Sequence, residues 1–263
     1  MTLKTIGVTG LGIMGRGIVE ACLGADYCVV VSEQNAESLE KGLAVLKNTL
    51  DRLARLKRLP AEVVEKLPDV LTGTTDISDF RQCDLVIEAI PENLAAKQQI
   101  FKTLDEICPA GTILASNTSC LPVARIGELT NRQDRIVGIH FFNPVSMMKL
   151  VEIIRTENTS QATLDTAQAF VESLGKTVVI APDTPGFIVN RLLLAFLSEA
   201  MRLYDLGVSA EDVDKAITLG LNHPMGPFKL ADFIGLDTAC YIARSMQEQL
   251  DAPHFAPPQI LEQ

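Results

Sequence analysis

The chain has 263 residues, of which 47% are hydrophobic, and a formal net charge of −10 at pH 7. This length and composition predict a globular protein with one large domain and a smaller companion, and they argue against a disordered chain. The acidic balance disfavours nucleic acid as a partner. The most apolar predicted helix, residues 187–197, is interrupted by Asn190 and Arg191 and is too short to cross a bilayer, so no membrane association is predicted.

The six cysteines are scattered along the chain, without a C-x-x-C pair and without histidine at the spacing of a metal site. We therefore predict reduced thiols and no bound metal. The amino-terminal residues lack the apolar stretch of a signal peptide and lead directly into a strand. Together these features predict a cytoplasmic protein.

A glycine-rich turn follows the first predicted strand, Thr5–Thr9, and opens a helix predicted to run through Leu23. Between strand and helix, the G-x-G-x-x-G spacing predicts a dinucleotide site. The first glycine allows the tight turn, the second lets the backbone approach a pyrophosphate, and the third lets helix and strand pack closely. The alternative is a glycine-rich turn without a ligand. The residues of the turn are Gly10, Leu11, Gly12, Ile13, Met14 and Gly15.

An acidic residue, Glu33, follows the second predicted strand, Cys28–Val31. In a dinucleotide fold this is the position at which a carboxylate accepts hydrogen bonds from the adenosine ribose, although a solvated strand-end glutamate is the alternative. Neither Gln34 nor Asn35 is basic, so no nearby cation would neutralise a 2′-phosphate. The sequence therefore favours NAD over NADP.

Residues 35–67 read as a helical excursion from the sheet, divided at Pro60. Its first arm is basic within an acidic protein. Such a charge run is either a solvated helix face or a landing site for a phosphorylated ligand, and composition does not decide between them. The basic residues are Lys41, Lys47, Arg52, Arg55, Lys57 and Arg58.

Three further strands are predicted at residues 84–90, 112–116 and 136–140, with helices at about 94–107 and 121–129 between them. This alternation predicts an α/β protein with a Rossmann-type, doubly wound and mostly parallel sheet. Ligands gather at the carboxyl ends of such strands. Polar groups follow all three strands, so we expect one shared cleft; they are Pro91-Glu92-Asn93, Ser116-Asn117-Thr118-Ser119 and His140.

The segment Ile136–Ile154 carries the predicted chemistry, with His140 at its centre. Asn143 and Pro144 turn the chain, and a second apolar run then carries Glu152. Charged groups are rarely buried unless they are paired. Two adjacent strands joined by this loop would set Glu152 beside the imidazole. The other histidines, His223 and His254, have no carboxylate in the sequence placed to orient them.

We predict a domain boundary near Pro182, where composition changes and the strand patterns end. Residues 1–182 would form the dinucleotide-binding domain, ending with a helix at about 160–174 and a strand at 177–180. Residues 183–263 would form an all-α domain with helices at about 187–206, 210–219 and 236–250. Apolar residues of the first of these helices form either a subunit interface or the core of this domain; they are Phe187, Leu192, Leu193, Phe196 and Leu197.

Seven motifs in order closely resemble the L-3-hydroxyacyl-CoA dehydrogenases, particularly the short bacterial 3-hydroxybutyryl-CoA type, and the resemblance covers nearly the whole chain. The motifs are the glycine turn Gly10–Gly15, Glu88-Ala89-Ile90-Pro91-Glu92-Asn93, Ser116-Asn117-Thr118-Ser119, His140-Phe141-Phe142-Asn143-Pro144, Leu150-Val151-Glu152, Pro185-Gly186-Phe187-Ile188-Val189-Asn190-Arg191, and Gly220-Leu221-Asn222-His223-Pro224-Met225-Gly226-Pro227.

The resemblance implies that His140 is the general base for the 3-hydroxyl group and that Glu152 supports its imidazole. It implies that Ser119 and Asn190 hydrogen-bond substrate oxygens, and that the basic excursion receives the coenzyme A nucleotide, with Lys57 as the first choice. It also implies a homodimer formed through the helical domain. Further residues that it assigns to the NAD site are Ala89, Ile90, Glu92, Lys97, Asn117, Ser119 and Asn143.

Two departures from the family pattern stand out. Cys120 replaces the second serine after Ser119, and family members usually continue beyond Pro258 into a basic, glycine-rich tail, whereas this sequence ends at Gln263. A truncated or a divergent terminus would explain this ending. If the family's tail contributes to dimer packing or to closing the cofactor site, its loss would affect activity and oligomeric state. Two other functions are compatible with the scaffold: oxidation of a free hydroxy acid or sugar acid, and NAD binding without catalysis.

Overall fold

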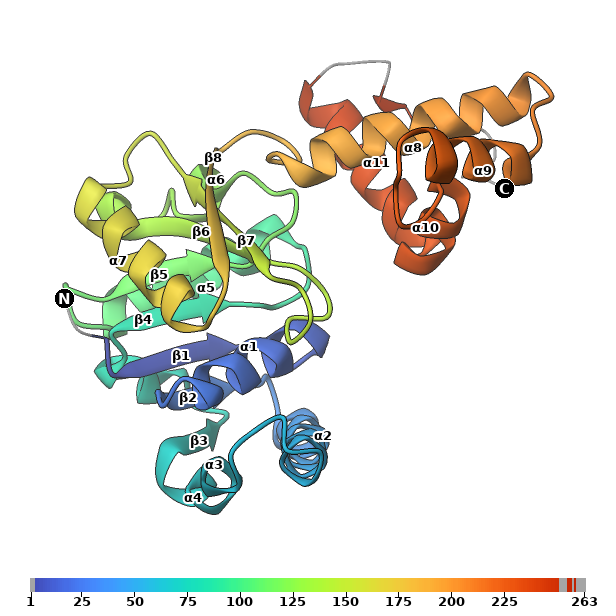
Figure 1. Ribbon diagram of the computed structural model, residues 1–263. Helices are drawn as coiled ribbons and strands as arrows, with labels where there is room; N and C mark the ends of the chain where they lie inside the picture. Colours follow the sequence, from blue (N-terminus) through green and yellow to red (C-terminus); the bar gives the residue numbers. More distant parts are fainter. Residues whose placement is uncertain (1–2, 251–254, 257, 259–263) are drawn as a thin grey trace. The chain divides into compact units, whose positions relative to one another are not determined.

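The computed structural model describes residues 3–250, 255, 256 and 258; His254 and most of the carboxyl-terminal stretch lie outside them. The chain divides into two compact units, Met1–Asp183 and Thr184–Gln263 (Figure 1). Each unit has its own hydrophobic core.

The first unit is built on an eight-stranded sheet with the order β3-β2-β1-β4-β5-β6-β7-β8. Six strands run parallel, and β7 pairs with β6 antiparallel and with β8 parallel. The strands are β1 (Thr5–Thr9), β2 (Cys28–Ser32), β3 (Leu71–Thr74), β4 (Leu85–Glu88), β5 (Ile113–Ser116), β6 (Ile136–Phe141), β7 (Leu150–Arg155) and β8 (Thr177–Pro182). The predicted doubly wound, mostly parallel sheet is confirmed.

The chain order places a topological switch point between β1 and β4. From β1 the chain proceeds outward to β2 and β3, and then crosses back to place β4 on the other side of β1. The loops that leave the carboxyl ends of β1 and β4 therefore diverge, and ligands of open α/β sheets bind in the crevice that forms there. Gly10 follows β1 and Ala89 follows β4, so the predicted glycine turn lies at this crevice.

Helices cover both faces of the sheet (Figure 1). Buried residues of α1, α2 and α7 share one core with Ile6 and Val8 of β1 and with Leu85 and Ile87 of β4. Alternation along the strands turns Val86 to the opposite face, as expected for a strand covered on both sides. The helices of this unit are α1 (Ile13–Gly24), α2 (Ala36–Arg55), α3 (Ala61–Glu65), α4 (Leu67–Val70), α5 (Leu94–Ile107), α6 (Val123–Ile126) and α7 (Gln161–Ser173), with 3₁₀ turns η1 (Ile77–Gln82) and η2 (Gln133–Arg135).

Two local predictions in this unit need correction. The helix expected at 121–129 is only the single turn α6, because Pro122 lies at its amino end and Gly127 at its carboxyl end. The short strand β3 follows directly after the helical excursion and was not expected, because a four-residue strand containing Gly73 has almost no alternating pattern.

The second unit contains helices and no strand among its described residues. Its helices are α8 (Val189–Asp205), α9 (Ala210–Gly220), α10 (Pro227–Ile234) and α11 (Leu236–Leu250). The helix α10 was not expected; Pro227 occupies its first turn, and the side chain of buried Asp214 accepts hydrogen bonds from the amides of Phe228 and Lys229. A search of the described residues finds no helix long and apolar enough to cross a membrane.

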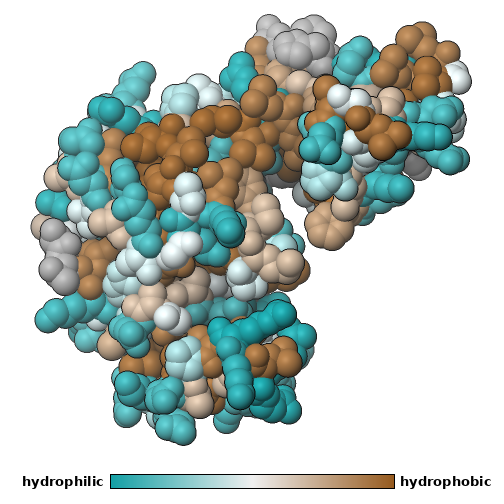
Figure 2. Space-filling view, viewed as in Figure 1, coloured by the Kyte–Doolittle hydropathy of each residue, from teal (hydrophilic) through white to brown (hydrophobic). Residues whose placement is uncertain are grey.

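Most of the apolar residues assigned to α8 and its approach serve the core. Phe187 and Leu197 are buried, and Leu193 and Phe196 pack against the core of the second unit, whereas Leu192 is 67% exposed. The core alternative is therefore correct for most of this set. Apolar surface also occurs over β8 of the first unit, where Val179 and Ile180 are exposed (Figure 2).

Candidate active site

The imidazole of His140 and the carboxylate of Glu152 form a buried pair. They are direct partners in the antiparallel register of β6 and β7, so their side chains emerge on the same face of the sheet. Nδ1 of His140 lies 2.8 Å from Oε2 of Glu152, and the side chains are only 4% and 1% exposed. The sequence prediction that Glu152 would stand beside the imidazole is matched by this geometry.

The pairing determines which ring nitrogen of His140 is basic. An ionised carboxylate only accepts hydrogen bonds, so Nδ1 carries a proton and donates a hydrogen bond to Glu152. In a neutral imidazole the other nitrogen, Nε2, is then the one that can take up a proton. The ring of Phe142 lies 4.5 Å from that of His140, measured between centroids, and helps to fix the orientation of the imidazole.

Asn117 connects the end of β5 with the end of β6. Its Oδ1 accepts a hydrogen bond of 2.9 Å from the amide of Phe141, the residue after His140. Its own amide donates to the carbonyl of Glu88 at the end of β4. Asn117 therefore holds three neighbouring strand ends in one arrangement, which brings together the three polar clusters that the sequence predicted to share a cleft.

The carboxylate of Glu92 organises the segment that carries Ser119. Oε1 accepts a hydrogen bond of 2.6 Å from the amide of Ser119, and both carboxylate oxygens lie 3.0 Å from the hydroxyl of Thr118. Glu92 itself is 25% exposed and lies 3.4 Å from the ammonium of Lys97. The loop after β4 thus sets the backbone position of Ser119 after β5.

Behind Glu92 lies a buried charge cluster that the sequence reading did not assign. Lys97 donates to Glu88 over 2.6 Å and to the carbonyl of Ile90 over 3.0 Å, and both charged side chains are at most 1% exposed. Glu88 also accepts from Ser116 and from the amide of Ile90. Burial raises the pKa of Glu88, although Lys97 and these hydrogen bonds act in the opposite direction.

A sequence signal for this cluster existed. Glu88 is a carboxylate that ends an otherwise apolar strand, and Lys97 lies in the first half of the following helix. The prediction placed Lys97 on the nicotinamide side of the site. Its buried ammonium contacts Glu88, Ile90 and Glu92, so any influence on a ligand passes through the loop that these groups fix.

The glycine turn has the geometry that a dinucleotide requires. Gly10 has a φ of +89°, and a Cβ there would lie 2.8 Å from the carbonyl oxygen of Ala89. A Cβ on Gly15 would lie 1.9 Å from the carbonyl oxygen of Gly10, whereas one on Gly12 would meet open space. Space at Gly12, at the amino end of α1, fits the approach of a pyrophosphate, so these residues can hold NAD.

Glu33 lies at the end of β2 and is turned toward this loop. Its Oε1 accepts a hydrogen bond of 2.6 Å from the amide of Leu11, and its Oε2 lies 3.3 Å from the amide of Gln34. The turn and the acidic residue, which the sequence assigned to two parts of one dinucleotide, are therefore in contact.

The other predicted residues belong to loops of the first unit and to the second unit. Asn143 is exposed in the loop between β6 and β7, and Lys57 is exposed just after α2 with a φ of 56°. Asn190 is buried in α8 of the second unit. His223 also belongs to that unit, where its ring lies 5.6 Å from the ring of Phe196. Among the described residues, no group of three or more His, Cys, Asp or Glu side chains could hold a metal ion.

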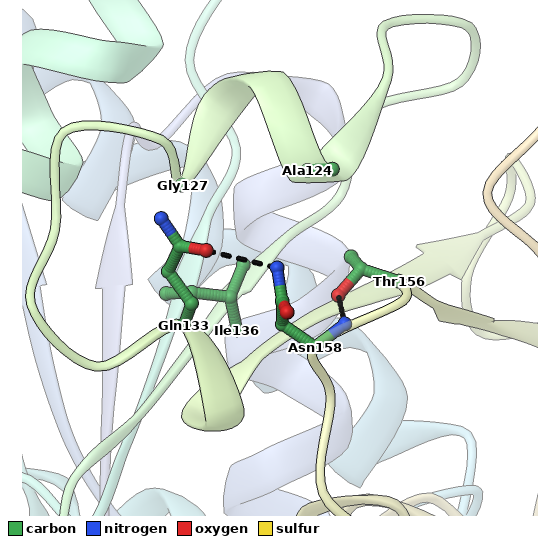
Figure 3. Close-up of a pocket in the computed structure, with 6 residues that line it drawn as sticks. All are labelled: Ala124, Gly127, Gln133, Ile136, Thr156 and Asn158. Atoms are coloured by element: carbon green, nitrogen blue, oxygen red, sulfur yellow. Dashed lines mark hydrogen bonds between the residues drawn. The ribbon is translucent and has the colours of Figure 1, made fainter.

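A small polar pocket lies near the amino end of β6, the end opposite to His140 (Figure 3). Within it Asn158 donates from its side chain to Gln133 and from its backbone to Thr156. These groups satisfy one another, and none of the predicted site residues lines the pocket. It is therefore separate from the candidate active site.

Such a sheet, with a dinucleotide turn after β1 and an oriented imidazole at the end of β6, the third strand along from β1, defines the class of nicotinamide-dependent dehydrogenases. The NAD binding domain of 3-hydroxyacyl-CoA dehydrogenase matches residues 5–184, and the C-terminal domain of the same family matches residues 186–263. The chain belongs to the 3-hydroxyacyl-CoA dehydrogenase family. It is accordingly an NAD-dependent oxidoreductase.

Individual relatives agree with this assignment. The probable 3-hydroxybutyryl-CoA dehydrogenase of Bacillus subtilis is 44% identical, over 98% of this chain and 90% of that protein. The human mitochondrial hydroxyacyl-coenzyme A dehydrogenase is 45% identical, over 94% of this chain and 81% of that protein. The crystal structure of (S)-3-hydroxybutyryl-CoA dehydrogenase from Ralstonia eutropha matches with a TM-score of 0.94 and 36% identity, over 99% of this chain and 93% of that chain.

Two glycine substitutions should separate packing from ligand binding in the turn. Gly15→Ala forces Cβ against the carbonyl of Gly10, so we expect a loss of about 1–3 kcal/mol in the free energy of unfolding, together with loss of NADH binding. Gly12→Ala meets no protein atom, so stability should change by less than about 1 kcal/mol while NADH binding weakens. Urea unfolding and NADH fluorescence titration measure both effects; equal behaviour of the two variants would contradict this division.

Replacing Lys97 should show how much an unpaired, buried carboxylate lowers the free energy of unfolding. In Lys97→Met, Glu88 loses its partner, and we expect the free energy of unfolding to fall by about 3–5 kcal/mol near neutral pH. Lys97 lowers the pKa of Glu88, so in its absence burial raises that pKa further above the value in the unfolded chain. The folded variant then holds a proton on Glu88 at a pH where its unfolded chain has lost it, so the stability of the variant falls as pH rises. The deficit should therefore be smaller at about pH 5 than at about pH 8. A deficit independent of pH would contradict this account.

Proposed function

We propose that the chain catalyses the reversible oxidation of an L-3-hydroxyacyl-CoA to the 3-oxoacyl-CoA, with His140 as the general base. The observation that supports this assignment most directly is the buried 2.8 Å hydrogen bond between His140 and Glu152, on two neighbouring strands of the sheet that carries the glycine turn. The family supplies the substrate class, and this pair supplies a base oriented by a carboxylate.

In this proposal Nε2 of His140 takes the proton of the 3-hydroxyl group. Glu152 keeps Nδ1 protonated and stabilises the imidazolium that forms, because a carboxylate at hydrogen-bond distance favours the charged ring. Bound NAD supplies the hydride acceptor. In the reverse direction the imidazolium returns its proton to the oxygen of the 3-oxo group, so one residue serves both directions.

Ser119 and Asn190 are proposed to hydrogen-bond the substrate oxygens, and Glu92, Lys97, Asn117 and Asn143 to shape the nicotinamide side. The contacts of Glu92 support this division, since its carboxylate holds the amide of Ser119 and leaves part of its own surface exposed. Asn117 and Lys97 contribute by fixing strand ends and loops. We propose that the helical unit, residues 183–263, supplies Asn190 and so takes part in substrate binding.

The adenosine end of NAD is assigned to Glu33, whose carboxylate suits the two ribose hydroxyls and would repel a 2′-phosphate. The coenzyme A nucleotide is assigned to the basic residues of α2 and the turn after it, and Lys57 remains the first choice. Of the basic residues there, Lys41 is already paired with Glu37 at 2.6 Å, whereas Lys57 stands exposed in the turn. We therefore place the coenzyme A phosphates at the carboxyl end of α2 and the turn after it, rather than beside Lys41.

A homodimer formed through the helical unit and a cytoplasmic location complete the proposal. Support for the dimer comes from large apolar side chains exposed on this unit, among them Leu192, Leu206, Leu219 and Phe233, since such side chains are often covered by a second subunit. Support for the location comes from the six cysteines, none of which forms a disulfide bond in the described structure.

The base assignment is tested by His140→Gln, assayed with acetoacetyl-CoA and NADH. Glutamine can still donate a hydrogen bond to Glu152 but cannot exchange a proton, so we expect turnover to fall by about 10²–10⁴-fold. Affinity for NADH, measured by fluorescence titration of the same variant, should stay nearly unchanged. Turnover equal to that of the unsubstituted protein would exclude His140 as the base.

The thioester assignment is tested by Lys57→Ala, assayed with acetoacetyl-CoA and with free acetoacetate. We expect the KM for acetoacetyl-CoA to rise several-fold with little change in kcat, because the lost charge binds the nucleotide far from the reacting atoms. Lys41→Ala, on the same helix but already paired with Glu37, is the matched control and should leave KM unchanged. Equally weak use of acetoacetyl-CoA and free acetoacetate by the unsubstituted protein would contradict a coenzyme A substrate.

A further inference from the structure

The loop between β6 and β7, residues 142–149, begins two residues after His140 and carries Asn143. Within this loop the amides of Met147 and Met148 both donate to the carbonyl of Pro144, which closes a turn. Met147 is 76% exposed at its tip. A loop with so little burial of its own depends on attachments to other elements for its position.

One attachment is the side chain of Lys176, which comes from the far edge of the sheet. Gly175, with a φ of +70°, follows α7 and directs the chain into β8, so that Lys176 precedes the first residue of that strand. Its ammonium donates to the carbonyl of Val145 and, over 2.9 Å, to that of Met148. A cation that holds two carbonyls three residues apart fixes the shape of the turn between them.

The same loop is packed against the helix that begins with the glycine turn. Val145 is buried, and a Cβ on Gly17 of α1 would lie 2.8 Å from its side chain. One turn further along α1, Glu20 faces the charge of Lys176. Burial lowers the pKa of Lys176, and the negative charge of Glu20 raises it again in part. Burial raises the pKa of Glu20, and the positive charges of Lys176 and Arg52 act in the opposite direction.

We propose that Lys176 is a positioning residue of the active site, which locks the loop after His140 onto the dinucleotide-binding helix α1. The lock fixes the spacing between the amino end of α1, which receives the pyrophosphate, and Asn143, which we assigned to the nicotinamide side. This inference rests on the proposed function for the role of Asn143. The contacts of Lys176, Val145 and Gly17 are independent of that role.

The test compares three variants by kinetics with acetoacetyl-CoA and NADH. Lys176→Met keeps the length of the side chain and removes both hydrogen bonds, so we expect kcat to fall by about 10-fold or more, because a misplacement on the order of 1 Å can cost about 10²-fold. The KM for NADH should rise several-fold. Lys176→Arg, which can donate to both carbonyls, should recover most of the activity, and Lys149→Met, which removes an exposed charge from the end of the same loop, should behave like the unsubstituted protein.

Hydrogen exchange of the amides of Met147 and Met148 supplies a readout that does not depend on the reaction. We expect these amides to exchange faster in Lys176→Met than in Lys149→Met. Faster exchange with unchanged kcat and KM would reduce Lys176 to a structural contact and overturn the proposal, as would unchanged exchange. If the unsubstituted protein did not reduce acetoacetyl-CoA, the proposed function would be wrong, but the role of Lys176 could still be tested. In that case, weaker NADH binding by Lys176→Met than by Lys149→Met would support the positioning role of Lys176.

Discussion

The antiparallel register of β6 and β7 is the constraint on which the arrangement of the active site depends. It sets His140 opposite Glu152 in the only antiparallel pair of the described sheet. A shift by one residue would place the carboxylate on the other face, because side chains alternate along a strand. The register is maintained on both sides: Asn117 holds the amide of Phe141 from β5, and the amide of Thr177 in β8 donates to the carbonyl of Lys149.

Buried charge has a second organising role at the centre of the sheet. Glu88 and Lys97 are both desolvated, which is costly for each ion and is tolerated because each has several polar partners. The result is a loop after β4 whose backbone is bonded at Ile90 on two sides, by Glu88 and by Lys97. Glu92, the partly exposed residue of this loop, can then hold the amide of Ser119 in a fixed position.

Much of this organisation could be predicted from the sequence because the informative features are local. The glycine turn, the strand ends and the carboxylate in an apolar run are each visible within a few residues. The carboxylate at the end of β4 signalled a buried charge, but its pairing with Lys97 depends on how α5 packs on the sheet and was not assigned. The contacts of Lys176 join residues up to 31 positions apart and leave no local pattern in the sequence. The strand β3 and the helix α10 were missed for a different reason, since short elements carry too few residues to show a period.

The hydrogen bond between Glu33 and the amide of Leu11 gives one carboxylate two duties. We proposed that its charge sets the preference for the coenzyme, and one of its oxygens supports the backbone of the glycine turn. Exchanging Glu33 for a small residue to admit a 2′-phosphate would therefore leave that amide without its acceptor, and a turn amide deprived of its partner loosens the site for either coenzyme. Redesign of this enzyme toward NADP must therefore provide a new acceptor for Leu11 as well as a cation for the phosphate.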